Sequence, residues 1–297
     1  MYCNITIYTY ILFKVLYIYN TIRMQYILLE IKPMQPQIES GAELLTRLNE
    51  KPSLHGLEDT LFSEGLQNTD IIEIGGERSS GKTFLLSQML ARCILPNNYA
   101  IKGCNASAIL INTDHHFQTS KLVELMSSII NTANISFSEA IDTEFDKTTI
   151  IKDSLRNLHI IDCYNNEQFS LTLHTLDDIF LDNTKIALLA IDSITAYYWQ
   201  DCEDNITTID TYIKKLLKII KLQTTRFNVA TIYTKLCESI HNKRNYLTND
   251  IDYKIQLCKV CNSTNFICTL ETIQIIRKIH YSILSNGIKW KIDEREG

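Results

Sequence analysis

The stretch Gly76-Glu77-Arg78-Ser79-Ser80-Gly81-Lys82-Thr83 is a complete phosphate-binding loop of the form G-x-x-x-x-G-K-T. It follows an apolar run at 70–74 and opens an apolar-periodic run at 84–95, which is the strand–loop–helix setting that the motif requires. Glycines let backbone N–H groups approach a pyrophosphate, and the start of the helix adds unpaired donors and a positive dipole end. We therefore predict that this loop binds ATP, with Lys82 on the β- and γ-phosphates and Thr83 on Mg²⁺.

A second carboxylate for the magnesium ion is expected downstream. Residues 185–191 form a continuous apolar run that ends in Asp192, as expected of a parallel strand buried on both faces. Open α/β sheets bind ligands at the carboxyl ends of their strands, so we predict that Asp192 is the Mg²⁺ ligand. The alternative is a core strand that ends in a helix-capping Asp192-Ser193 pair.

Composition narrows the class of protein. A chain of 297 residues can bury one substantial core, and a net charge of −5 gives no global attraction for nucleic acid, so any DNA contact must be local. Nine cysteines are expected to be reduced thiols in a cytoplasmic or nuclear protein. Cys258, Cys261, Cys268 and His280 lack the second short ligand spacing of a typical zinc site.

The N-terminal residues 1–38 differ from the rest of the chain. Ile5 to Tyr19 is almost wholly apolar and aromatic, but Lys14 interrupts a run that is shorter than the roughly 20 residues of a spanning helix. A signal peptide would need a small-residue cleavage site, which does not follow. We interpret residues 1–38 as a hydrophobic or disordered extension, or as a gene-model artefact with translation starting at Met34, and expect no membrane association.

Strand and helix patterns alternate through residues 39–297, which we predict to be one α/β domain with a doubly wound, mostly parallel sheet flanked by helices. A short helix at 42–48 and an irregular stretch at 52–66 precede the first strand. The strands are predicted at 70–74, 108–113, 158–163, 185–191 and 228–233, and the helices at 82–95, 120–131, 169–181 and 206–223. Beyond residue 249 the periodicity is less regular, and 266–270 and 288–292 are predicted as edge strands of the tail after residue 261.

Several stretches resemble the RecA/Rad recombinase family, and within it the recombinase paralogues. They are Glu39–Leu48, Ala91–Pro96, Asn112–Phe117, Ile191–Trp199 and Asp250–Tyr253. The matching stretches run in order from residue 39 to about residue 259, roughly three quarters of the chain. The phosphate loop is generic, whereas Ala91-Arg92-Cys93-Ile94-Leu95-Pro96 and Ala196-Tyr197-Tyr198-Trp199 are specific to the resemblance.

The resemblance implies a RecA-like P-loop NTPase core in a nuclear, partly cytoplasmic protein of homologous recombination. Such paralogues form complexes that help the recombinase load on single-stranded DNA in double-strand break repair, replication-fork protection and meiosis. It further implies a terminal subunit bound to the D paralogue. The sequence shows no helix-hairpin-helix module before residue 39 and no obvious Phe-x-x-Ala linker, so we expect a subunit that accepts a neighbour's strand but donates none.

Two positions of the sequence argue against rapid turnover of ATP. The resemblance implies a water-orienting Glu where this chain has Asp114, which is shorter by one methylene, and a misplacement of ~1 Å can cost about 100-fold in rate. It also implies a γ-phosphate-sensing Gln where Thr234 and Lys235 stand. Lys235 is either a phosphate-contacting cation or a solvated lysine. We expect nucleotide binding with slow or partner-dependent hydrolysis.

DNA contacts are expected from two loops. The loop 196–204 carries three aromatic residues and three acids, which favours a packed aromatic cluster over base stacking. The loop 239–245 is short and basic, and Lys243 and Arg244 are the predicted DNA contacts. Lys214, Lys215, Lys218 and Lys221 recur at helical spacing, a pattern that is usually a solvated face.

Two alternative functions for the protein stay open: an active DNA-dependent ATPase and a membrane-tethered P-loop NTPase.

Overall fold

The computed structural model describes residues 40–43, 46, 50–98, 101–136, 144–201, 208–237, 250–260 and 266–291. The chain divides into two compact units, residues 1–45 and 46–297. In the first unit the described residues 41–43 are helical, and Ser40 caps them reciprocally with Glu43. The Ser40 amide donates to the Glu43 carboxylate at 2.8 Å and the Glu43 amide donates to the Ser40 hydroxyl at 3.2 Å, which is a capping box. The predicted residues 1–38 lie outside the described residues.

The second unit is built on a nine-stranded sheet in the order β3-β2-β4-β5-β1-β6-β7-β8-β9. Five strands from β3 to β1, together with β6, run parallel, and β7, β8 and β9 continue the sheet with antiparallel pairings. The strands are β1 (Ile71–Gly76), β2 (Ser107–Asn112), β3 (Leu158–Asp162), β4 (Ile186–Asp192), β5 (Ala230–Leu236), β6 (Tyr253–Lys259), β7 (Phe266–Glu271), β8 (Ile276–Leu284) and β9 (Gly287–Lys291). The predicted mostly parallel α/β sheet is therefore confirmed.

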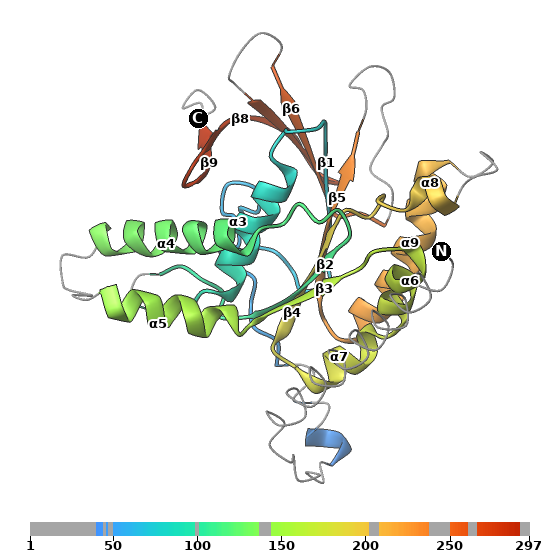
Figure 1. The fold of residues 1–297 in the computed structure, drawn as a ribbon, viewed down its shortest axis with the longest axis horizontal. Coiled ribbons are helices and arrows are strands. Elements are labelled where there is room, and N and C mark those ends of the chain that lie inside the picture. The colour runs from blue at the N-terminus through green and yellow to red at the C-terminus, as the bar shows by residue number, and fades with distance from the viewer. Residues whose placement is uncertain are drawn as a thin grey trace, which may run out of the picture. The chain divides into compact units, whose positions relative to one another are not determined.

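Helices cover both faces of the sheet (Figure 1). One face carries α3 (Lys82–Ile94), α4 (Thr119–Ser136) and α5 (Glu144–Leu155). The other carries α6 (Asn166–His174), α7 (Leu176–Asp182) and α9 (Ile209–Arg226), with the short α8 (Tyr198–Asp201) beyond the end of β4. The alternation of side chains along the central strands separates the two cores, because successive residues of a strand face opposite sides.

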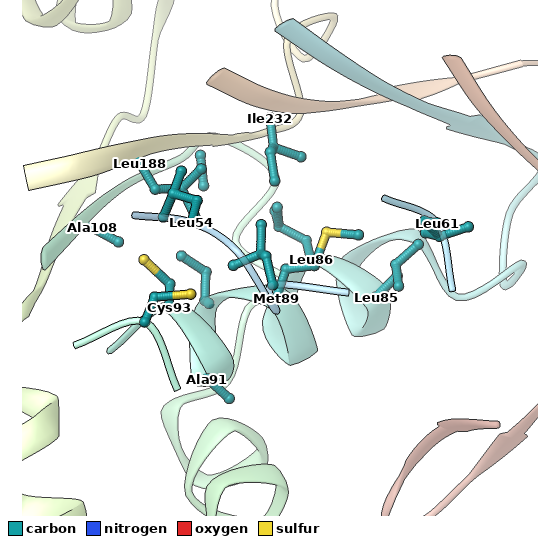
Figure 2. Close-up of a cluster of buried hydrophobic side chains, with 14 of the residues drawn as sticks. Leu54, Leu61, Leu85, Leu86, Met89, Ala91, Cys93, Ala108, Leu188 and Ile232 are labelled. Atoms are coloured by element: carbon teal, nitrogen blue, oxygen red, sulfur yellow. The ribbon is translucent and has the colours of Figure 1, made fainter. Parts of the chain in front are cut away.

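The core on the α3 face is the larger of the two. Figure 2 shows Leu85, Leu86 and Met89 of α3 packed among side chains from the strands and from the segment that carries Leu54 and Leu61. The predicted irregular stretch 52–66 is confirmed as turns whose leucines are fully buried. These leucines therefore belong to the core between the sheet and α3, the helix that follows the phosphate loop.

Three predictions about elements need correction. The single helix predicted at 169–181 is two helices, α6 and α7, which meet at Thr175. The strand predicted as an edge at 266–270 is interior, since β7 pairs with β6 on one side and β8 on the other. The tail contains β6 and β8 as well; in β8 the pattern is weakened because the apolar Ile276 and Leu284 lie on its exposed face.

Candidate nucleotide-binding site

The phosphate loop joins the carboxyl end of β1 to the start of α3, as its sequence predicts. Its backbone requires glycine at two positions. A Cβ at Gly76 would lie 2.4 Å from the Leu257 carbonyl oxygen, and Gly81 has a φ of +93°. Ser79 also has a positive φ, 58°, so the loop curves tightly around its own N–H groups.

Lys82 lies across the loop. Its ammonium donates to the carbonyl oxygens of Gly76 at 3.0 Å and Glu77 at 2.7 Å. Burial lowers the pKa of Lys82, whereas the negative charges of Asp192, Cys237 and Asp114 oppose this shift. The Lys82 ammonium is therefore held beside the loop and near acidic groups. A bound phosphate would compete with the two backbone carbonyl oxygens for the hydrogen bonds of this ammonium.

Asp192 is buried at the end of β4, next to β5. Thr234 of β5 donates its hydroxyl to Asp192 Oδ1 at 2.5 Å, while Oδ2 is buried with no hydrogen-bond partner among the described residues. Burial raises the pKa of Asp192, whereas the hydrogen bond from Thr234, the nearby Thr83 hydroxyl and the charge of Lys82 act against that rise. An unpaired carboxylate oxygen beside a helix-starting Thr83 is the oxygen donor set that Mg²⁺ takes in such loops.

The described residues fit an ATP·Mg²⁺ pair. Besides Asp192 Oδ2, the buried Ser80 hydroxyl has no described hydrogen-bond partner, and both groups lie at the loop. Buried polar atoms without partners are uncommon in folded proteins and mark a place where a ligand completes the bonding. Thr83 and Asp192 are the protein groups that would hold the metal ion, which would supply positive charge to the phosphates.

Asp114, the predicted water-orienting residue, is exposed and lies beside this cluster. The backbone amides of Thr113 and Asp114 both donate to the Asp192 carbonyl oxygen, at 2.8 and 3.0 Å, which ties the end of β2 to the end of β4. The charge of Asp114 acts on both Lys82 and Asp192. The fold therefore brings Asp114 close to the loop, although no described contact fixes its carboxylate.

Lys235 does not take either role proposed from the sequence. Its side chain is only 11% exposed, so it is not a solvated lysine, and its ammonium pairs with the buried Glu73 carboxylate at 2.9 Å. Tyr233 donates to the same carboxylate at 2.8 Å. Since Thr234 bonds to Asp192, its neighbours Tyr233 and Lys235 face the opposite side of the sheet. A phosphate-contacting Lys235 is therefore inconsistent with the structure.

The predicted DNA contacts are only partly described. Lys243 and Arg244 lie outside the described residues. In the loop after β4, Tyr197 and Tyr198 are buried and Tyr198 packs on Tyr212, which agrees with a packed aromatic cluster, whereas Trp199 is 67% exposed. The α9 lysines are exposed, and Lys221 pairs with Asp250 at 3.8 Å.

Two further expectations concern metals and membranes. Across the described ranges, no group of three or more His, Cys, Asp and Glu side chains is arranged to hold a metal ion. Cys258 and Cys268 are free thiols there. Within the same ranges, none of the helices has the length and apolar character needed to cross a bilayer.

Sequence reasoning missed two residues: one supports the phosphate loop, and the other lies on the opposite face of the sheet and holds Lys235. Tyr281 of β8 donates its hydroxyl to the Ser80 carbonyl oxygen at 2.8 Å, so a distant hairpin supports the phosphate loop. No local pattern marks this contact. Glu73 did carry a signal, because an acid in the middle of an otherwise apolar strand must find a buried partner.

Comparisons with known proteins agree with this geometry. The sequence pattern of the Rad51 family matches residues 55–250, about two thirds of the chain. DNA repair protein XRCC2 of Mus musculus is 27% identical over 235 residues, which cover 74% of this chain and 79% of that protein. DNA repair and recombination protein RadA of Methanocorpusculum labreanum is 24% identical over 54% of this chain and 48% of its own length. RadA of Haloquadratum walsbyi is likewise 24% identical over 54% of this chain and 50% of its own length.

The chain thus spans about half the length of these RadA proteins and more than three quarters of mouse XRCC2. The family match includes the phosphate loop, Asp114 and Asp192, all three of which the fold brings together at the carboxyl edge of the sheet. The RecA-like α/β core expected from the sequence is confirmed by the sheet and by this match. The chain belongs to the Rad51 family.

Proposed function

We propose that this protein is an ATP·Mg²⁺-binding subunit of a DNA repair complex that acts in homologous recombination. The observation that carries the proposal is the convergence of Lys82, Thr83 and Asp192 at one loop, with Asp192 Oδ2 and the Ser80 hydroxyl buried and unpaired there. The names of the relatives supply the biological setting, since mouse XRCC2 is a DNA repair protein and RadA is a DNA repair and recombination protein.

The more detailed role follows from the recombinase-paralogue resemblance. The protein assists recombinase loading on single-stranded or fork DNA in double-strand break repair, fork protection and meiotic recombination, acting mainly in the nucleus. Its partners are other recombinase paralogues, with the D paralogue as its direct neighbour. DNA binding is weak or through these partners, with Lys243 and Arg244 as candidate contacts, because a net charge of −5 gives no general attraction for phosphates.

An exposed sheet edge supports the partner role. β3 pairs with β2 alone among the described strands, and Ile160 of β3 is 39% exposed. The opposite edge strand, β9, carries Lys289 and Lys291, and edge lysines discourage pairing with another chain. β3 carries no lysine, so it is the edge at which a neighbour's strand would add.

Hydrolysis is slow or dependent on a partner in this proposal. Asp114 is the one candidate near the described site for orienting the attacking water, but its carboxylate is exposed and is shorter than the Glu that the family resemblance implies. Thr234 occupies the position next to Asp192 and bonds to it, and Lys235 is committed to Glu73. An active DNA-dependent ATPase is the alternative, favoured only by the closeness of Asp114 to Lys82.

Titration with a fluorescent ATP analogue tests nucleotide binding. The full chain is expected to bind the analogue only with Mg²⁺ present, and Lys82→Ala is expected to abolish binding because it removes the phosphate-contacting cation. Lys185→Ala, which removes an exposed lysine far along the chain from the loop, serves as the matched control and should bind normally. Equal affinity in Lys82→Ala and the wild type would refute the site.

Two further measurements separate the candidate roles. Steady-state phosphate release should be slow with and without single-stranded DNA, and a large DNA-stimulated rate would instead establish a DNA-dependent ATPase. Affinity purification of the tagged protein from cells should recover recombinase paralogues. Recovery without any recombinase paralogue would contradict the repair-complex assignment while leaving nucleotide binding intact.

A further inference from the structure

A second cavity lies beside α3, away from the phosphate loop. It has a volume of about 570 Å³ and lies between α3, α4, the β8–β9 hairpin and the segments around residues 59 and 102. The described residues that line it include none of the loop residues 76–83. Gln88 and Arg92 of α3 line it, and Arg92 follows Lys82 by ten residues, a distance of about 15 Å along a helix.

Positive charge dominates the lining of this cavity. Arg92, Lys102 and Lys289 line it together with a single carboxylate, Asp59, in a chain whose net charge is −5. Neither Lys102 nor Lys289 forms an ion pair with another residue in the described part of the chain. Two exposed lysines therefore add charge to the cavity that no described acid neutralises.

Arg92 is incompletely bonded as well. Its Nη1 donates to the Gly56 carbonyl oxygen at 3.4 Å, a long hydrogen bond, and its Nε is buried without a partner among the described residues. A guanidinium has five N–H donors, so most of its capacity remains available. Its charge also acts on the buried Glu58, whose pKa is raised by burial and partly lowered again by Arg92.

The polar wall of the cavity is held in place by Gln88. Its Oε1 accepts from the Ile288 amide at 2.7 Å, and its Nε2 donates to Glu58 at 2.9 Å. Both ends of the amide are thus fixed, which joins the hairpin to α3. The other wall is mostly apolar: Leu125, Ile129 and Ala133 come from α4, which also contributes Ser128 and Thr132, and Leu284 and Ile288 come from the hairpin.

We propose that this cavity is a second ligand site, distinct from the phosphate loop, that binds a small organic anion with an apolar body. A phosphate monoester or carboxylate head would lie on Arg92, Lys102 and Lys289, where charge-assisted hydrogen bonds are stronger than neutral ones. The apolar body would pack on the α4 and hairpin side chains. Binding pockets of this kind are mostly apolar with a few convergent polar groups.

The test uses 8-anilinonaphthalene-1-sulfonate, a fluorescent probe that has a sulfonate on an aromatic body. The full chain carrying Lys82→Ala, which removes the phosphate loop as an anion site, is expected to bind it saturably at one site. Adding Lys102→Glu and Lys289→Glu should weaken this binding about tenfold or more, since charge-assisted hydrogen bonds are lost and like charges are introduced. Adding Lys215→Glu and Lys218→Glu instead makes the same change of charge on exposed α9 positions and should leave binding unchanged.

The ligand chemistry is tested with a matched neutral probe. N-phenyl-1-naphthylamine has the same aromatic body without the sulfonate and should bind about tenfold more weakly or worse. Competition with 1-naphthyl phosphate and with 1-naphthoate distinguishes a phosphate ligand from a carboxylate ligand, and displacement by either supports the site. Equal binding of the neutral probe, unchanged binding in the Lys102→Glu/Lys289→Glu variant, or displacement by neither competitor would overturn the proposal. Thermal unfolding of each variant confirms that it is folded.

Discussion

Two adjacent residues of β5 lie on opposite faces of the sheet and bond to different buried carboxylates. Thr234 faces the phosphate loop and bonds to Asp192, whereas Lys235 faces α9 and pairs with Glu73. Strand alternation forces this division, so a one-residue change of register would place a buried ammonium at the proposed metal site. The nucleotide site therefore depends on which of the two residues points toward it.

Asp192→Asn is expected to stabilise the nucleotide-free protein by on the order of 1 kcal/mol at pH 7, because it removes a buried charge at a functional site. Burial raises the pKa of Asp192, so the folded state holds the proton more tightly than the unfolded state. The stability of the wild type should accordingly fall as the pH rises above about 4, and the advantage of Asp192→Asn should shrink in acid. Urea unfolding at several pH values checks this.

The same variant should no longer gain stability from Mg²⁺ and ATP, since the proposed metal ligand is gone. Asp114→Asn is the control, because Asp114 is exposed and should give no gain in the nucleotide-free state. A destabilised Asp192→Asn that still responds to Mg²⁺ and ATP would show that this carboxylate is structural.

Lys235→Ala should destabilise the fold by about 3–5 kcal/mol, since it leaves the buried Glu73 carboxylate without its counter-charge. Replacing both partners, as in Glu73→Leu with Lys235→Met, should recover most of this loss. Burial lowers the pKa of Lys235, but the charge and hydrogen bond of Glu73, together with Cys237 and Asp210, raise it, and the net pKa lies above its usual value. The contribution of the pair should persist below about pH 10.5 and disappear above the folded-state pKa. Urea unfolding of the single and double variants measures both effects, and a fully stable single variant would contradict the account.

At the level of elements, the β8–β9 hairpin buttresses the phosphate loop and α3. Tyr281 bonds to the Ser80 carbonyl oxygen, Gln88 accepts from the Ile288 amide, and a Cβ at Gly81 would lie 2.8 Å from Ile283 Cδ1. The loop is therefore packed between its own helix and an antiparallel extension of the sheet.

Tyr281→Phe tests this support. Loss of one buried hydrogen bond should cost about 1 kcal/mol of stability and weaken the binding of an ATP analogue about fivefold, because the Ser80 carbonyl loses its donor. Tyr164→Phe, whose parent side chain is 68% exposed, is the matched control and should change neither quantity. Isothermal titration with Mg²⁺ present gives the affinity, and unaltered affinity in Tyr281→Phe would exclude the hairpin as a support.

The elements differ in how well the sequence predicts them. The positions of the parallel strands could be predicted from the sequence, since β1, β2, β4 and β5 are mainly apolar runs that are buried on both faces. Lys82, Thr83 and Asp192 followed from motif and strand end. The edge strand predicted at 288–292 is confirmed as β9, whereas β8 could not be placed, because it is only partly buried and its role depends on pairings between distant residues. For the same reason Lys235 was misjudged: its partner Glu73 lies 162 positions earlier, on another strand.

At the scale of the whole molecule, the two ends of the sheet differ in chemistry. β9 closes one end with lysines, and β3 leaves the other end with a partly exposed Ile160 and no lysine. A sheet whose lysines discourage strand pairing at one edge, and whose other edge lacks them, suits a subunit that pairs with a neighbour on one side.

Ile160→Lys should abolish capture of a recombinase paralogue in a pull-down with purified proteins, because it places a charge on the accepting edge. Surface substitutions of this kind usually change stability by less than about 0.5 kcal/mol, so nucleotide binding should persist. Ile276→Lys on β8, where the parent side chain is 70% exposed, is the control and should leave capture intact. Normal capture by Ile160→Lys would place the partner elsewhere.

The bond from Tyr281 to Ser80 joins residues 201 positions apart. During synthesis the ribosome releases the motif long before it releases the strand that braces it, so the nascent chain carries a recognisable phosphate loop that is not yet supported. A transcript interrupted between the codons for Lys259, at the end of β6, and Tyr281 would encode all the parallel strands and every ATP-contacting residue proposed above, and we expect its product to bind ATP more weakly. Truncating alleles of this gene should therefore be judged by whether they retain β8, and not by whether they retain the motif.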